Sequence, residues 1–217
     1  MPNARQHAIQ HSQTRTRERR HRVATEAAKI IAQGGTRDYL QAKHKAAERL
    51  GIFDDASLPR NTEIEMALRE YQRLFVTGQD QALQRRREAA VEALKFFVSF
   101  DPRLVGPVLE GTADHRSPVT LHVHSDEPEA LDRWLDQHRI DHEVRSRRIR
   151  LDREREFEAP VYRFEADELP IEIIALPATA LRQAPLSVID EKPMRRANLA
   201  QAQALLADDE ITAFFGR

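Results

Sequence analysis

The stretch from Val105 to Ser125, VGPVLEGTADHRSPVTLHVHS, decides how the fold is predicted. It contains two short apolar runs joined by a glycine-bearing turn, and the second run alternates apolar and polar residues. Successive side chains of a strand point to opposite faces, so one face of the second run is apolar and the other is polar. Val119, Leu121 and Val123 form the face expected in the core. Thr120, His122 and His124 form the other, which we expect to be exposed.

Period-two patterns continue after this stretch and predict a sheet. The expected strands cover residues 104–109, 119–124, 144–151, 161–165 and 171–176. An amphipathic helix at 127–139 separates the second strand from the third, and residues 197–215 predict a final helix.

The first 100 residues instead show helical periodicity. Helices are expected from residue 23 to the glycines at 34–35, and over 38–50, about 61–75 and 80–97. Thr62 and Glu65 have the spacing of a capping box, and Arg85, Arg86 and Arg87 are expected on the solvent side of the fourth helix. We therefore predict an α+β fold with a basic, disordered or frayed arm (1–22), a helical region (23–100) and a mixed-sheet domain with C-terminal helices (101–217).

Composition narrows the classes of protein to consider. The 217 residues carry 34 Lys and Arg against 35 Asp and Glu, a formal charge of -1, so no global basic field draws the molecule to nucleic acid. The absence of cysteine excludes disulfides and zinc-thiolate sites and agrees with a reducing compartment. No apolar run approaches the roughly 20 residues of a membrane span. We expect a cytoplasmic protein of bacterial type that does not bind a membrane. The arginines of the arm are either a solvated tail or a contact to RNA, DNA or acidic lipid.

Gly106-Pro107, Gly111 and the run from Ser117 to Leu121 together resemble the nucleotidyltransferase superfamily typified by DNA polymerase β. That family has a strand ending in Gly-Ser, a second glycine, and then a strand beginning Ser-Asp-hydrophobic-Asp. A third family carboxylate lies on a later strand, where this chain has Glu172. The resemblance covers about residues 85–180 and implies a nucleotidyltransferase-like mixed sheet. It further implies that Gly106, Gly111, Ser117 and Thr120 face a nucleotide.

The departures from the family pattern concern its chemistry. Family members hold two divalent cations on carboxylates spaced i, i+2. Here Pro118 and Thr120 occupy those positions, Pro107 replaces the serine of the Gly-Ser pair, and Glu172 remains as the single matched carboxylate, a tentative catalytic residue. The resemblance thus implies a pseudoenzyme that binds a nucleotide or nucleic acid, or a regulatory module.

Other chemistry stays open from the residues alone. His122, His124 and Glu172 are an acceptable ligand set for zinc or another divalent metal, which a metal-dependent hydrolase or a divergent, active nucleotidyltransferase would use; polar residues on an exposed strand are the simpler interpretation. Arg148 and Arg150 share one face of a strand and are candidate phosphate contacts or charges on an exposed edge. Arg195 and Arg196 are candidate anion contacts or part of a solvated loop.

Overall fold

The computed structural model describes residues 3–36, 38–75, 79–127 and 129–215, with side chains described from residue 13 to 208 apart from those near the gaps. The chain divides into two compact units. Unit 1 comprises residues 1–77 with 188–190, and unit 2 comprises residues 78–187 and 191–217. The boundary between the units falls before the fourth helix. This helix is grouped with the sheet in unit 2, whereas the sequence analysis grouped it with the three preceding helices.

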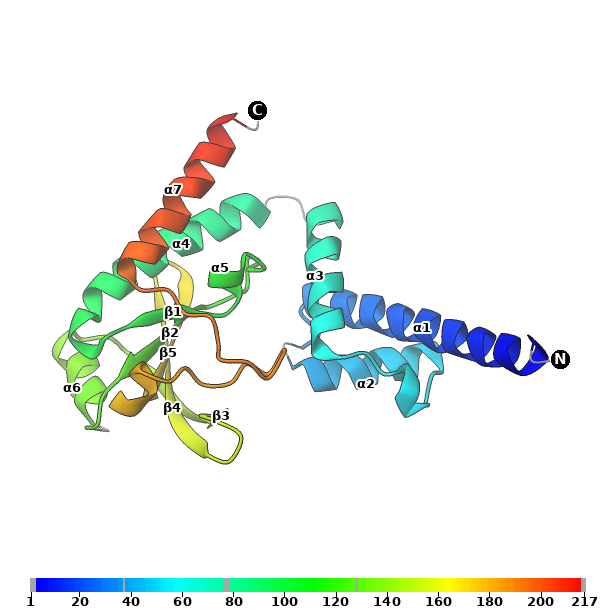
Figure 1. The fold of residues 1–217 in the computed structure, drawn as a ribbon. Helices are drawn as coiled ribbons and strands as arrows, with labels where there is room; N and C mark the ends of the chain where they lie inside the picture. The colour runs from blue at the N-terminus through cyan, green and yellow to red at the C-terminus, as the bar shows by residue number, and fades with distance from the viewer. Residues whose placement is uncertain (1–2, 37, 76–78, 128, 216–217) are drawn as a thin grey trace. The chain divides into compact units, whose positions relative to one another are not determined.

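Unit 1 is built from three helices (Figure 1): α1 (Asn3–Ala32), α2 (Tyr39–Leu50) and α3 (Asn61–Phe75), with a short 3-10 turn η1 (Asp55–Ser57). Its core contains Val23, Ala27 and Ile30, as the helical periodicity predicted, packed against Ala46 and Ile64. The arm predicted at residues 1–22 continues α1 as helix, because that helix begins at Asn3.

The caps of α2 explain its boundaries. Asp38 accepts hydrogen bonds from the amides of Leu40 and Gln41, and Gly51 ends the helix with φ 64°. The capping box predicted at Thr62 and Glu65 is shifted. At the start of α3 the Glu63 carboxylate accepts from the Arg60 amide, while Glu65 bonds the Tyr39 hydroxyl and Arg69.

Unit 2 contains a five-stranded mixed sheet (Figure 1) in the order β1-β2-β5-β4-β3. The strands are β1 (Arg103–Val105), β2 (Val119–His124), β3 (Glu143–Arg150), β4 (Glu156–Ala166) and β5 (Leu169–Leu176). Only the β2–β5 pair is parallel; the other neighbours are antiparallel. The strand predicted over 104–109 is wrong in its second half, where Gly106 turns the chain into the short helix α5 (Pro107–Glu110).

Helices cover one face of this sheet. These are α4 (Gln79–Phe96), α6 (Ala130–Gln137) and α7 (Leu199–Phe215), with α4 and α7 in contact (Figure 1). Leu121, Val119 and Val123, each 0 % exposed, form the centre of the core beneath them, as alternation predicted. The 3-10 turns η2 (Val98–Phe100) and η3 (Ala178–Leu181) complete the unit, and η3 packs on the other face. None of the helices in the described ranges is long and apolar enough to cross a membrane.

Candidate functional site

The polar face of β2 lies next to a polar patch on β5 and β4. Thr120 is the register partner of Glu172, and Glu172 is in turn the partner of Arg163. The sheet thus brings Thr120 and Glu172 side by side. We call the sheet surface that carries Thr120, His122, His124 and Glu172 the polar face.

Glu172 is the centre of an ion-pair network on the polar face. Its side chain is 6 % exposed, and its two oxygens accept from Arg147 Nη1 and Nη2 at 2.9 and 2.8 Å. Arg163 Nε and Nη2 donate to Oε1 at 3.0 and 2.8 Å. Each arginine side chain is 40 % exposed. Fork-shaped guanidinium contacts of this kind fill the lone pairs that a metal ion would need.

The polar face does not fit a divalent metal. Residues 118 and 120 carry no carboxylate, and Glu172 is already neutralised by two cations. In the described part of the chain, no three His, Asp or Glu side chains are grouped so that they could hold a metal ion. The magnesium pair of the resembled family and the zinc set of His122, His124 and Glu172 both lack geometric support here.

His122 and His124 are buried, although we expected them on an exposed strand face. They are 1 % and 6 % exposed. Burial, followed by the proximity of the titratable His124 and of the charged Arg196 and Arg147, lowers the pKa of His122 to about 3. The pKa of His124 is also lowered, first by burial, although its Nδ1 lies 2.8 Å from the Asp101 carbonyl oxygen. Both rings are therefore neutral at pH 7.

The glycine turn before β2 has the backbone that its glycines allow. Gly106 has φ 72° and ψ −156°, and Gly111 has φ 78°. No atom lies within 4 Å of a Cβ placed on Gly106, so the space beside it is open. The Ser117 hydroxyl is engaged with Asp114 in the same turn. It donates to the Asp114 carboxylate at 2.8 Å and accepts from the Asp114 amide.

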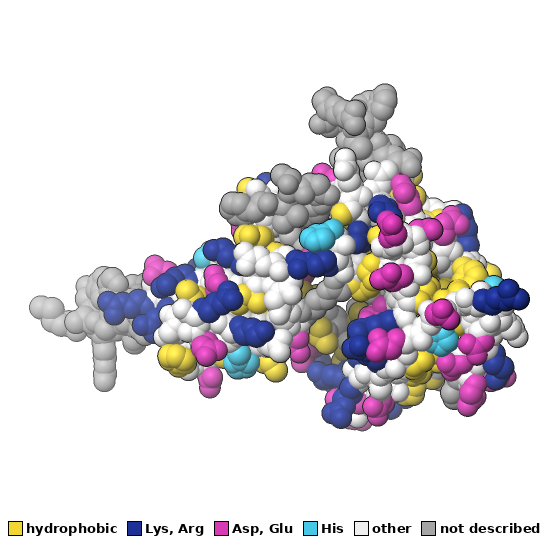
Figure 2. Space-filling model, turned by 180° about the vertical axis from the view of Figure 1, so that it is seen from behind, with side chains coloured by type: hydrophobic (Ala, Val, Ile, Leu, Met, Phe, Trp, Pro, Cys, Tyr) yellow, Lys and Arg dark blue, Asp and Glu magenta, His cyan; other side chains and the backbone are white. Residues whose placement is uncertain are grey.

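The predicted phosphate contacts are scattered. Arg148 and Arg150 lie on β3, an edge strand as the alternative interpretation held, and pair with Glu156 and Glu191. Arg195 pairs with Glu110 at 3.0 Å. Arg196 instead turns to the backbone carbonyls of Ala180 and Leu181 and reaches the polar face. Figure 2 shows acidic and basic side chains mixed over the visible surface, in keeping with the charge of -1.

Two arginines of α4 are buried, although we expected them on the solvent side of this helix. Arg86 is 3 % and Arg87 is 8 % exposed. Arg86 Nε donates to the Ser117 carbonyl at 2.7 Å, and its Nη2 donates to the His115 carbonyl, so it holds the loop before β2. A signal was present, because Arg86 and Arg87 lie four residues before the buried Ala90 and Val91.

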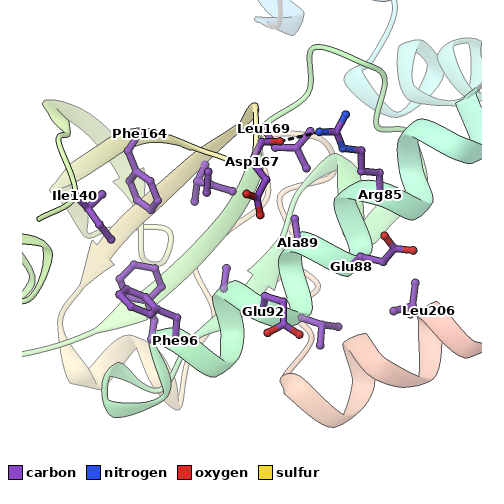
Figure 3. A pocket seen from close by; sticks show the side chains of 15 residues that line it. Arg85, Glu88, Ala89, Glu92, Phe96, Ile140, Phe164, Asp167, Leu169 and Leu206 are labelled. Carbon is purple, nitrogen blue, oxygen red and sulfur yellow. Dashed lines mark hydrogen bonds between the residues drawn. The ribbon is translucent and has the colours of Figure 1, made fainter. Parts of the chain in front are cut away.

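A pocket of about 530 Å³ lies on the helix-covered side of the sheet, opposite the polar face (Figure 3). Phe96, Ile140 and Phe164 supply apolar walls, and Glu88 and Glu92 line it from α4. Arg85 donates to the Asp167 carbonyl at 2.7 Å at its edge. Nothing in the sequence pattern indicated this pocket, because its walls come from residues 85–206 and meet only in the fold.

Comparisons with known proteins give no assignment. No family model, no curated protein and no solved structure matches the chain.

Proposed function

We propose that the chain is a nucleotidyltransferase-like module that binds a phosphate-bearing ligand, a nucleotide or nucleic acid, without transferring a nucleotidyl group. The order of elements supports this. β1 ends at Gly106, a short helix and Gly111 follow, and β2 returns antiparallel to β1. β5 lies parallel beside β2, with Glu172 opposite Thr120. These placements support the proposal, because the resemblance predicts a strand that ends in glycine, a second glycine, a following strand and a carboxylate on a later strand.

The observation that carries the proposal is the pairing of Glu172 with Arg147 and Arg163. In the resembled family, this carboxylate position would contribute negative charge to a metal site. Here two guanidiniums against one carboxylate leave a net positive charge at the same position. A surface of that sign attracts phosphate and repels metal cations, so it favours recognition over two-metal chemistry.

A cytoplasmic location, expected from the lack of cysteine, belongs to the same proposal.

Calorimetric titration tests the proposal directly. The full-length protein is titrated with each nucleoside triphosphate and with short single-stranded RNA and DNA, with and without Mg²⁺. We expect saturable binding of at least one of these ligands that does not require Mg²⁺. A parallel transfer assay with a labelled triphosphate should show no product.

Two results would overturn the proposal. One is the absence of binding for every nucleotide and oligonucleotide. The other is Mg²⁺-dependent transfer that is lost in Glu172→Gln, because it would mean that Glu172 leaves its arginines and serves catalysis. Glu156→Gln, which removes an exposed partner of Arg148, is the matched control for a change of charge alone.

A further inference from the structure

A second group of basic side chains lies on the polar face, beyond the Glu172 network. Arg103 of β1 is the register partner of His122 on β2. Directly paired residues of neighbouring strands share a face, so the Arg103 side chain lies beside the two histidines. The charge of Arg103 acts on His124, in agreement with this placement.

Arg196 joins this group from the segment before α7. Leu104 and Ala197 form an antiparallel bridge with hydrogen bonds of 2.8 and 2.9 Å. Leu104 and Ala197 both belong to the core on the helix-covered side. The preceding residue, Arg196, therefore points to the polar face, where its charge acts on His122 and His124.

Neither arginine has a carboxylate partner among the described residues. Arg103 donates to the Pro102 carbonyl at 2.8 Å, and Arg196 donates to the carbonyls of Ala180 and Leu181. Burial, with Arg103 nearby, lowers the pKa of Arg196. The Asp101 carboxylate also acts on His124, but it pairs with neither guanidinium. Two guanidiniums that repel each other are an unfavourable arrangement, which a bound anion would relieve.

The histidines supply unused hydrogen-bonding groups at the same place. Both ring nitrogens of His122 and Nε2 of His124 are buried and have no hydrogen-bond partner. A buried polar group without a partner costs about 1–3 kcal/mol, so native proteins contain few of them. Neutral His122 has one N–H and one lone pair, and Nε2 of His124 has a lone pair because its Nδ1 donates to the Asp101 carbonyl. These atoms suit a ligand that has both acceptor oxygens and a protonated oxygen.

We propose that Arg103, Arg196, His122 and His124 form a binding site for a phosphate group. The two guanidiniums supply charge-assisted donors, and neutral His122 supplies one imidazole N–H to a phosphate oxygen. Nδ1 of His124 donates to the Asp101 carbonyl, so its Nε2 accepts from a protonated phosphate oxygen. The inference rests on the proposed function in one respect: the phosphate of a bound nucleotide is one source of this group, and free phosphate or pyrophosphate is the other. No metal takes part, and the oxyanion balances the positive charge itself.

The test uses inorganic pyrophosphate and phosphate as probes on the full chain. Pyrophosphate should bind saturably in calorimetry, and the Cε1–H resonances of His122 and His124 should shift in the NMR spectrum during the same titration. Arg103→Gln removes one guanidinium without breaking an ion pair among the described residues. It should weaken pyrophosphate binding about 10- to 100-fold, as expected for a hydrogen bond to a charged group.

Arg195→Gln is the matched control, because Arg195 adjoins Arg196 but pairs with Glu110 instead. It should leave pyrophosphate affinity unchanged. Equal weakening by both variants, or no saturable binding and no histidine shift at millimolar pyrophosphate, would overturn the site. Circular dichroism of each variant confirms that the fold is retained.

The outcomes separate this site from the proposed function. Pyrophosphate binding that depends on Arg103, with no binding of any nucleotide or oligonucleotide, supports the site and overturns the proposed function. Nucleotide binding that Arg103→Gln does not change supports the proposed function and overturns the site.

Discussion

At the scale of single residues, Glu172 is the side chain whose role changed most between sequence and structure. The sequence offered it as a catalytic carboxylate, whereas the structure engages it with two arginines. Glu172→Gln keeps the size of the side chain but leaves two guanidiniums facing a neutral amide. Removing one partner of a fully buried pair costs about 3–5 kcal/mol. Because both arginines are 40 % exposed, we expect a smaller loss of unfolding free energy, about 1–3 kcal/mol.

Urea denaturation of Glu172→Gln and of Glu156→Gln measures this difference. Glu156 pairs with Arg148 at 3.5 Å on the surface, so its loss should cost less than about 1 kcal/mol. Equal effects of the two substitutions would mean that the Glu172 network contributes no more than a surface ion pair.

His122 provides a prediction about pH. Burial, with the nearby His124, Arg196 and Arg147, lowers its pKa from 6.5 to about 3 in the folded protein. Between these values the unfolded chain binds a proton that the folded protein does not bind. The stability from neutral His122 is therefore fully present above pH 6.5 and decreases as the pH falls toward 3, by up to about 1.4 kcal/mol per unit.

The unfolding free energy of the wild type should therefore decrease as the pH is lowered from about 7 to about 5. The decrease should be smaller in His122→Leu, which cannot take up a proton. His138→Gln removes an exposed histidine at the C-terminal end of α6 and is the control for the loss of one histidine side chain. Identical slopes in wild type and His122→Leu would show that another group titrates.

At the scale of elements, the glycine turn between β1 and β2 can be tested by substitution. Gly106 has φ 72° and ψ −156°, a region that other residues essentially do not occupy, whereas Gly111, at φ 78° and ψ 15°, is left-handed helical. Because a Cβ on Gly106 would meet no atom within 4 Å, the cost of Gly106→Ala is purely conformational. We expect about 2–3 kcal/mol for Gly106→Ala and about 1 kcal/mol for Gly111→Ala. Guanidinium denaturation of the two variants checks the order, and a larger loss in Gly111→Ala would contradict it.

Elements with a simple period could be predicted from the sequence, and those set by tertiary contacts could not. β2 matches its predicted range because alternation places Val119, Leu121 and Val123 in the core. The strand predicted over 104–109 failed because apolar residues such as Val108 and Leu109 are equally suited to a short buried helix.

The positions of the polar-face residues on their strands were predictable from the sequence, and their contacts with other residues were not. Strand period placed Thr120, His122 and His124 on one face, and the resemblance pointed to Glu172 beside them. The burial of the histidines, and the arginines from β3 and β4 that occupy Glu172, depend on which strands become neighbours. Sequence periodicity contains no information on that order.

At the scale of the whole molecule, the two units have separate cores. Ile64 is 0 % exposed in the core of unit 1, and Leu121 is 0 % exposed in the core of unit 2. The chain has one tryptophan, Trp134, and it lies in unit 2. Its fluorescence thus reports unit 2 alone, whereas far-ultraviolet circular dichroism reports the helices of both units.

These two probes should separate the units in a denaturation experiment. Replacing a buried Ile or Leu by Ala costs about 2–5 kcal/mol, since it removes apolar contacts and leaves a cavity. Ile64→Ala should lower the midpoint of part of the circular dichroism transition and leave the Trp134 fluorescence midpoint unchanged. Leu121→Ala should lower the fluorescence midpoint. If Ile64→Ala shifts both probes equally, the two cores unfold as one cooperative unit, and the division into independent units does not hold in solution.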